Sequence, residues 1–412
     1  MEKIKYLIIG GGIAGTTAAE TIRKFDTSGS IAIVSDEPHR LYSRVMLSKP
    51  NFFLEKIPFE QIWLKKESWY KESGIDLIAG QKAVHLDANN KTIGLEDGRN
   101  LGYEKLLLSI GGCARKWGIP GSDKRGVFYL RTLDDARAII AAVKTAHQAL
   151  AIGGGFISFE MCEMLRMAGI AVTLILREPY YWEPLLDEPS GRMIERALEP
   201  GGVKILYAAE VSQVLGQEEV SGVVLKDGTN ISCDMIIVGI GVSCPLERLV
   251  ASGGLEVKRG ILANEYLETS LPDVWAAGDV AEFKDLIIGD KIQLGNWVNA
   301  QVQGRVAGAN MAGQRQPFRM VSFYTTQGLG ITLAFVGDVR PGPDRAAIPR
   351  GSADSRAYGR IMIKDGKIIG ATLINRTTEL ATISRIIERG IEVAGRKKEL
   401  ADPDFDLKTL LT

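Results

Sequence analysis

Apolar residues along this chain occur in short runs that alternate with glycine turns and helical repeats. The apolar run at residues 3–9 is followed by a glycine turn, and residues 13–24 then repeat at helical spacing. A second apolar run at residues 31–34 ends in Ser35-Asp36-Glu37. A strand, a helix and a second strand in this order predict a βαβ unit with a parallel sheet and a right-handed crossover.

The same pattern returns later in the chain. A second glycine turn follows the apolar run 149–152, and an Asp-Gly hairpin turn follows each βαβ start, at 97–98 and at 227–228. Closing strands are predicted at 105–110 and 235–240. The pattern predicts an internal duplication and an α/β fold with two Rossmann-like dinucleotide-binding domains.

A third region begins near residue 319. Strands are predicted at 329–336, 359–364 and 367–374, with Asp365-Gly366 as a hairpin turn. A helix follows, and one face of it carries Leu380, Ile383, Ile386, Ile387 and Ile391. We expect a C-terminal α+β interface domain at 319–412, after a discontinuous first domain (1–113 and 245–318) and a second domain (114–244).

Composition narrows the classes of protein. A chain of 412 residues is too long for one ordinary domain, and a hydrophobic content of 45% supports a large core. The 50 Lys and Arg balance the 50 Asp and Glu, so charge predicts neither a nucleic-acid nor a membrane partner. No apolar run reaches the roughly 20 residues that span a bilayer, and the first run lacks a signal-peptide cleavage site. We expect a cytoplasmic protein.

The cysteines and histidines indicate neither a disulfide nor a metal site. Cys113, Cys162, Cys233 and Cys244 form no Cys-x-x-Cys pair, and none is spaced with a histidine as a ligand pair. We expect four small buried hydrophobic residues and no metal.

The first glycine turn has the composition of a dinucleotide site. Gly10 makes the tight turn, Gly12 lets the backbone approach a pyrophosphate, and Gly15 lets helix and strand pack closely. The helix N-terminus then offers free N–H groups to the phosphates. Asp36 or Glu37, with Glu37 preferred, would hold the ribose hydroxyls. A glycine turn that binds nothing is the alternative.

A third motif, Thr269-Ser270-Leu271-Pro272-Asp273-Val274-Trp275-Ala276-Ala277-Gly278-Asp279, follows the two glycine turns. With these three motifs in this order, the chain resembles the FAD-dependent pyridine nucleotide-disulfide oxidoreductase superfamily, in its rubredoxin and ferredoxin reductase branch. The resemblance implies that the first turn binds FAD and the second binds NADH or NADPH. It also implies that Asp279 binds the flavin ribityl chain and that Gly278 allows close approach.

Further flavin contacts are implied by similar segments. The segment at 42–49 is similar to the family's Arg-x-x-Leu-Ser-Lys, and the segment at 110–115 to its Ala-Thr-Gly-x-x-Pro, with Ile110 at the threonine position. The stretch 296–304 resembles the one that approaches the pyrimidine end of the flavin, although Trp297 could equally be a core residue. The FAD contacts implied outside the third motif are Ile13, Ala14, Arg44, Lys49, Gly111, Trp297 and Ala300.

Lys49 and Glu160 are the catalytic candidates. In the family a lysine beside the flavin ring lies near a glutamate after the second turn. The resemblance implies that the Lys49 ammonium favours negative charge on the reduced ring. Two ordinary surface charges are the alternative.

The second glycine turn carries a departure. Gly153 and Gly155 match the family, whereas Ser158 replaces the third glycine. Serine is small, so a slight shift of the helix would preserve the site. Phe156 or Ile157 would line the nicotinamide pocket.

The next strand leaves the choice of nucleotide open. It ends apolar, and Arg177, which could pair with a 2′-phosphate, precedes Glu178, which could hold a ribose diol.

We expect an enzyme that passes electrons from NAD(P)H through FAD to a small rubredoxin- or ferredoxin-type protein. No cysteine precedes Cys113, which disfavours thiol chemistry at the flavin. An oxidase that uses dioxygen directly is the second possibility, and an FAD-binding subunit of a larger complex without nicotinamide turnover is the third. A homodimer is a possible assembly.

Overall fold

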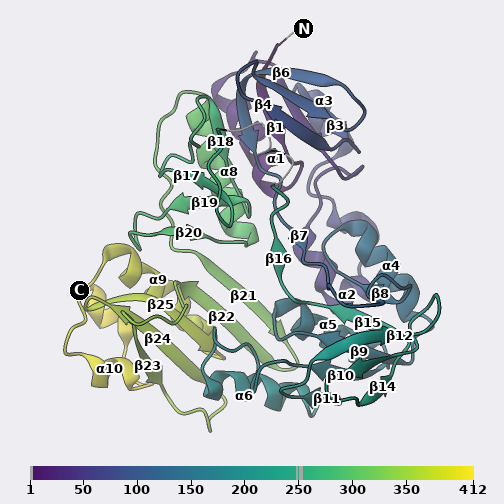
Figure 1. Cartoon of the computed structure of the whole chain (residues 1–412). Helices are drawn as coiled ribbons and strands as arrows, with labels where there is room; N and C mark the ends of the chain where they lie inside the picture. The colour runs from purple at the N-terminus through teal and green to yellow at the C-terminus, as the bar shows by residue number, and fades with distance from the viewer. Residues whose placement is uncertain (1–2, 247–248, 250–253) are drawn as a thin grey trace. The chain divides into compact units, whose positions relative to one another are not determined.

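The computed structural model describes residues 3–246, 249 and 254–412. The chain divides into two compact units (Figure 1), each built from segments that are distant in sequence. Unit 1 comprises residues 1–43, 60–113 and 242–322, and unit 2 comprises 44–59, 114–241 and 323–412. The division into three domains at the predicted boundaries stays a prediction.

Unit 1 is built on a seven-stranded sheet in the order β3-β2-β1-β6-β5-β4, with β18 paired to β6. The strands β3, β2, β1, β6 and β18 are parallel, and β6, β5 and β4 are antiparallel. These strands are β1 (Lys3–Ile9), β2 (Ile31–Ser35), β3 (Ile75–Ala79), β4 (Ala83–Asp87), β5 (Thr92–Leu95), β6 (Asn100–Leu108) and β18 (Val274–Ala276). The other elements of this unit are α1 (Ile13–Phe25), α3 (Glu67–Glu72), β17 (Ile261–Ala263), β19 (Ala281–Lys284), β20 (Lys291–Gln293) and α8 (Trp297–Met311).

The second parallel sheet, in unit 2, has the order β11-β10-β9-β15-β8. Its strands and helices are β8 (Val127–Phe128), α4 (Leu133–Val143), β9 (Gln148–Ile152), α5 (Phe156–Met167), β10 (Ala171–Ile175), α6 (Glu188–Leu198), β11 (Val203–Leu206) and β15 (Met235–Val238). A separate antiparallel sheet holds β12 (Val211–Leu215), β13 (Gly222–Leu225) and β14 (Asn230–Ser232). The chain passes from one unit to the other after residues 43, 59, 113, 241 and 322. The short elements η2 (Phe59–Ile62) and β7 (Cys113–Ala114) include two of these points, and β16 (Val242–Ser243) follows a third.

The two parallel sheets confirm the predicted duplication. In each, the strand before the glycine turn lies between the second strand of its βαβ unit and the closing strand. One detail differs from the prediction: residues 105–108 are the second part of β6, which begins at Asn100 as a hairpin strand. The first half therefore uses one long strand where the second half uses β14 and β15.

The C-terminal part of unit 2 is an antiparallel sheet in the order β21-β22-β25-β24-β23, packed against a helix. Its elements are β21 (Phe323–Gly328), β22 (Ile331–Gly337), β23 (Ala346–Arg350), β24 (Tyr358–Lys364), β25 (Lys367–Ile374), η3 (Thr377–Glu379), α9 (Leu380–Arg389), α10 (Lys397–Ala401) and η4 (Leu407–Leu411). Residues 44–59 also belong to unit 2 and form η1 (Arg44–Ser48) and α2 (Pro50–Phe53).

Sequence patterns missed β21 and β23 and placed one helical residue wrongly. β23 contains Pro349, which is compatible with its position at the edge of the sheet. The predicted helical face is formed by Ile383, Ile386 and Ile387, which are buried. Ile391 lies beyond the helix, because Gly390 adopts a left-handed conformation at φ 60° and ends it.

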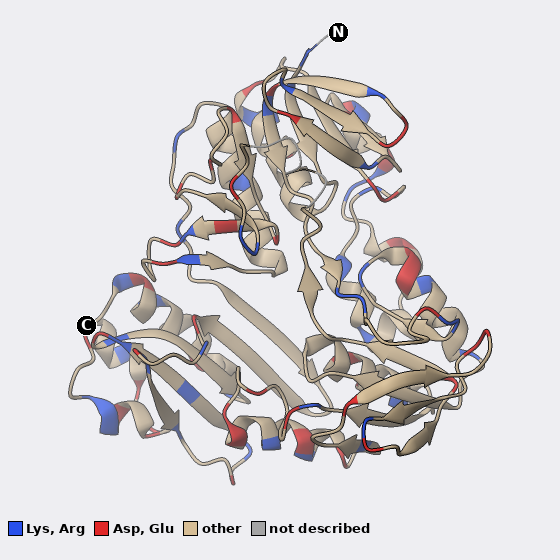
Figure 2. Cartoon of the chain, viewed as in Figure 1, with Lys and Arg blue, Asp and Glu red and all other residues tan. Residues whose placement is uncertain are grey.

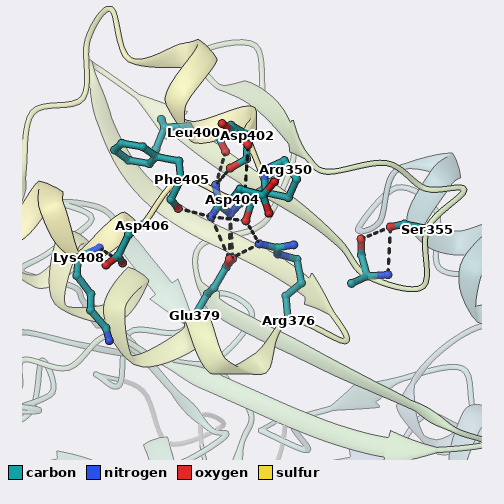
Figure 3. Close-up of polar contacts among 12 residues, drawn as sticks. Arg350, Ser355, Arg376, Glu379, Leu400, Asp402, Asp404, Phe405, Asp406 and Lys408 are labelled. Atoms are coloured by element: carbon teal, nitrogen blue, oxygen red, sulfur yellow. Dashed lines mark hydrogen bonds and ion pairs between the residues drawn. The ribbon is translucent and has the colours of Figure 1, made fainter.

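Arg350 organises the end of the chain (Figure 3). Only 1% of its surface is exposed, and its guanidinium donates to both carboxylate oxygens of Glu379. It also donates to the main-chain carbonyls of Leu400, Asp402, Pro403 and Phe405. One buried side chain therefore ties the last segment to β23.

The distribution of charge follows the balanced composition. Acidic and basic residues are interspersed along both units (Figure 2). No helix in the described part of the chain combines the length and apolarity needed to cross a bilayer.

Candidate dinucleotide sites

The first glycine turn requires glycine for steric reasons. Gly10 has φ 116°, and a Cβ built on it would lie 2.1 Å from the carbonyl oxygen of Ser109. A Cβ on Gly15 would lie 2.0 Å from the carbonyl oxygen of Gly10. Both contacts are far shorter than van der Waals distance. Gly10 and Gly15 are therefore explained by the turn and by helix packing, as the sequence predicted.

Gly12 differs, because among the described residues no atom beyond its chain neighbours lies within 4 Å of a Cβ built there. It is the N-cap of α1, and no side chain in the described part of the chain caps the helix. The first helical turn also contains no acidic residue. An open glycine at an uncapped helix N-terminus fits a phosphate group, since the free N–H groups and the helix dipole favour negative charge there.

The acidic residues after β2 are differently placed. Asp36 is exposed, whereas Glu37 is half-buried and accepts a hydrogen bond of 2.6 Å from the Tyr42 hydroxyl. Tyr42 is itself buried. Glu37 is therefore the better oriented of the two candidates for ribose hydroxyls.

Residues from three distant motifs meet beside α1. A Cβ on Gly278 would lie 3.2 Å from Cβ of Ala14 and 3.7 Å from Cβ of Ala300. The N–H of Gly278 donates to Gln303 of α8 at 2.7 Å, and Gly278 has φ 83°. The third motif, the first helix and α8 are thus joined around small residues.

The other predicted flavin contacts of unit 1 have more exposed positions. Asp279 is half-buried, and its carbonyl accepts a hydrogen bond from Gln293 at 2.8 Å. Trp297 is half-buried at the first position of α8, next to the N-cap Asn296. Gly111 has φ 67°, and Ile13 is the first residue of α1.

The second glycine turn repeats the construction of the first. Gly153 has φ 97°, and a Cβ on it would lie 2.7 Å from the carbonyl oxygen of Gly239. Gly155 is the N-cap of α5 without a side-chain cap, and the nearest atom to a Cβ there is 3.9 Å away. The hydroxyl of Tyr181 donates to the Gly155 carbonyl at 2.7 Å, and burial raises the Tyr181 pKa well above its usual value.

Ser158 is accommodated by an exchange of residues between helix and closing strand. In the first half, Ser109 follows the closing strand, faces Gly15 and donates to the carbonyl of Ile9 at 3.0 Å. In the second half the serine is on the helix: Ser158 donates to the carbonyl of Ile152 at 3.3 Å and faces Gly239. The same hydrogen bond is therefore made from opposite sides, and the departure from the family pattern preserves the contact.

Phe156 begins α5 within an aromatic cluster. Its ring centroid lies 3.9 Å from that of Tyr324, 4.3 Å from Trp182 and 5.4 Å from Phe335. Neighbouring Ile157 is half-buried. Tyr324 and Phe335 come from β21 and β22, so the C-terminal sheet contributes directly to the surroundings of the second turn.

The register of the two sheets shows which residue of the second half corresponds to Glu37. Gly10 donates to the carbonyl of Val34 and Gly153 to that of Ile175, at 2.7 and 3.0 Å. Glu37 and Glu178 are each the third residue after that carbonyl. Glu178 thus occupies the position that corresponds to Glu37, and the more exposed Arg177 donates to its carboxylate at 2.9 Å.

Lys49 and Glu160 form an ion pair within unit 2. Lys49 Nζ lies 2.5 Å from Oε1 of Glu160, whose side chain is 2% exposed. The interpretation as two ordinary surface charges is therefore wrong. The structure adds a partner that the sequence did not indicate, because Thr326 of β21 donates to the same oxygen at 2.6 Å. Arg44, from the same predicted segment, donates to the carbonyl of Arg131.

The cysteines correct one expectation. Cys162 and Cys233 are buried, and burial raises the pKa of each thiol to about 12. Cys113 is exposed and Cys244 is half-buried, so not all four are core residues. Among the described residues, no group of His, Cys, Asp and Glu side chains is arranged to hold a metal ion.

Comparison with known proteins covers nearly the whole chain. Residues 4–304 match the family described as pyridine nucleotide-disulphide oxidoreductase, and residues 323–411 match a reductase C-terminal family. The ferredoxin–NAD(+) reductase component of the biphenyl dioxygenase system of Paraburkholderia xenovorans is 31% identical over 98% of this chain and 97% of its own.

Solved structures agree with this similarity. A ferredoxin reductase from Rhodopseudomonas palustris is 27% identical with a TM-score of 0.91, over all of both chains. Putidaredoxin reductase in its covalent complex with putidaredoxin is 26% identical with a TM-score of 0.92, over 100% of this chain and 99% of the other. The fold with two dinucleotide-binding domains and a C-terminal α+β domain is confirmed.

Proposed function

Because the chain belongs to the pyridine nucleotide-disulphide oxidoreductase family, we propose that it is an FAD-dependent NAD(P)H reductase that delivers electrons to a small ferredoxin-type protein. The proposal is supported chiefly by one observation, which is that the two glycine turns are built in the same way. Both glycine turns place an open glycine at the uncapped start of a helix, at Gly12 and at Gly155. Two such sites on one chain suit transfer between a nicotinamide and a flavin.

The chain's own residues supply binding and orientation. The N-terminus of α1 would take the FAD pyrophosphate, and Glu37, held by Tyr42, would bind the ribose. When bound, FAD accepts two electrons as a hydride and can release them singly. The roles of Lys49 and Glu160 beside the flavin stay predictions, as do the contacts from Arg44, Asp279 and Trp297.

We further propose a preference for NADH. Glu178 corresponds in register to Glu37, so the two carboxylates would serve the two ribose diols in the same way. The carboxylate would also repel a 2′-phosphate, while Arg177 is engaged with Glu178 itself. The choice between NADH and NADPH can therefore be tested by substituting Glu178.

The acceptor class is supported by the reductases that match the full length, including one solved with a redox partner. A rubredoxin-type or a ferredoxin-type protein fits the proposal. A homodimer and a cytoplasmic location stay predictions.

The decisive experiment is an anaerobic titration of the purified flavoprotein with NADH and with NADPH, followed by addition of an oxidised ferredoxin. We expect NADH to bleach the oxidised flavin band at about 450 nm and the ferredoxin to restore it. Glu178→Ala should weaken NADH binding about tenfold or more, since it removes hydrogen bonds to a charged group. Glu183→Ala, at another half-buried glutamate of the same segment, serves as the control.

Each alternative has its own outcome. Rapid oxygen consumption without ferredoxin would favour the oxidase. A bound flavin that neither nucleotide reduces would refute the reductase and favour a subunit fed by a partner. Equal reduction by NADPH would refute the role of Glu178.

A further inference from the structure

The strand β21 follows the helix α5 along one face. Phe156, Glu160 and Glu163 lie three or four residues apart, so they share a helical face. They meet Tyr324, Thr326 and Leu329 in the same order: the ring centroids of the first pair lie 3.9 Å apart with the planes tilted by 51°, and the other two pairs form hydrogen bonds of 2.6 and 2.8 Å. Tyr324 and Thr326 point to the same side because strand side chains alternate. The C-terminal sheet thus contacts the helix that begins at the second glycine turn.

Of the two residues that donate to Glu160, Thr326 is the more rigidly held. It is buried, it is β-branched, and its strand pairs with β22 through Thr326 opposite Leu333. Lys49, by contrast, has a long flexible stem, and 33% of its side chain is exposed. A lysine of this kind can turn toward solvent, whereas a threonine in a sheet cannot.

Two donors satisfy the buried carboxylate of Glu160. A buried carboxylate is costly unless it is paired and hydrogen-bonded. Oε1 of Glu160 accepts from both Lys49 Nζ and Thr326 Oγ1, so the hydroxyl fixes the oxygen to which the ammonium is attached. Burial, and then the negative charge of Glu160, raise the pKa of Tyr324 on β21.

We infer that Thr326 is a positioning residue, which acts through Glu160 to hold the Lys49 ammonium in the orientation needed for reduction of the flavin. Reductase activity therefore depends on contact between the C-terminal strand β21 and α5. The inference rests on the proposed function and adds to it a residue that neither the family motifs nor the glycine turns identify.

The test compares Thr326→Val, which removes the hydroxyl and keeps the shape, with Thr326→Ser, which keeps the hydroxyl. Thr325→Val is the matched control, because Thr325 is exposed on the same strand and faces the other side. Anaerobic stopped-flow mixing with NADH gives the rate constant of flavin reduction and the nucleotide affinity separately. We expect Thr326→Val to slow reduction about tenfold with unchanged NADH affinity and flavin content, in line with the loss of one hydrogen bond to a charged group. Thr326→Ser should restore most of the rate.

A second readout does not need the flavin. Amine labelling of the flavin-free chain, quantified by mass spectrometry, reports how firmly Lys49 is held. We expect labelling of Lys49 to become severalfold faster in Thr326→Val and to stay unchanged in Thr325→Val. In a Glu160→Gln background, the change at Thr326 should add little to either readout, since the two residues act as one unit.

The inference is overturned if Thr326→Val matches the wild type in rate and labelling, or if its effect persists undiminished in the Glu160→Gln background. Failure of the proposed function looks different, because the wild-type flavin itself would not be reduced by NADH or NADPH. The labelling experiment would then still decide whether Thr326 holds the ion pair.

Discussion

Replacing Arg350 by Met should make the C-terminal segment, residues 397–411, open more often from the rest of its unit. Methionine keeps an unbranched apolar stem and removes every donor. Four main-chain carbonyls, from Leu400 to Phe405, each lose a hydrogen bond from Arg350, and Pro403 and Glu379 keep only the one from Arg376. At about 1 kcal/mol for each carbonyl, the loss is about 4 kcal/mol. The same figure lies within the roughly 3–5 kcal/mol for breaking a buried ion pair.

Hydrogen exchange measured on peptides that cover residues 397–411 is the appropriate assay, since it reports opening of this segment alone. A loss of about 4 kcal/mol corresponds to roughly a thousandfold faster exchange by opening. Arg350→Lys keeps the charge but not the planar guanidinium, so the exchange rate in this variant should lie between those of the wild type and Arg350→Met. Arg385→Met, at an exposed position of α9, is the control. Exchange within about tenfold of this control would refute the assignment of Arg350 as the anchor.

Three further predictions test the turns and the acid response. Gly15→Ala should abolish FAD retention during purification, measured from the flavin absorbance, because its Cβ would lie 2.0 Å from the Gly10 carbonyl oxygen. Gly239→Ser should weaken NADH binding, measured by titration, because the new side chain would collide with Ser158. Adding Ser158→Gly should restore binding, since the double variant has the serine after the closing strand and the glycine on the helix, as in the first half of the chain. A double variant that binds NADH no better than Gly239→Ser would contradict this interpretation. Arg376 and Arg350 lower the pKa of Glu379 although burial opposes them, so its stabilising contribution is present above the ordinary glutamate pKa and is lost as the pH falls through the lowered one. Acid unfolding followed by circular dichroism should therefore be less steep for Glu379→Gln than for the wild type.

Much of the fold could be predicted from local patterns. The turn residues Gly98, Gly228 and Gly366 all adopt positive φ between antiparallel strands, as the Asp-Gly pairs indicated. β21 and β23 were missed for different reasons. β21 has the polar run Thr325-Thr326-Gln327 without a clean alternation, and β23 contains a proline. Helix α9 was found, but its end at Gly390 was placed too late.

The sequence by itself determined the two glycine turns, because their requirements are local: positive φ at Gly10 and Gly153, and close approach at Gly15. It also placed Glu37 and Glu178 at the ends of their strands. Only the tertiary structure decided which residues support these turns. Ser158 is tolerated because a glycine lies opposite it at position 239, and Glu160 is held by a threonine 166 residues away. Neither contact leaves a periodic pattern along the chain, since each depends on two segments that meet only when the sheets have formed.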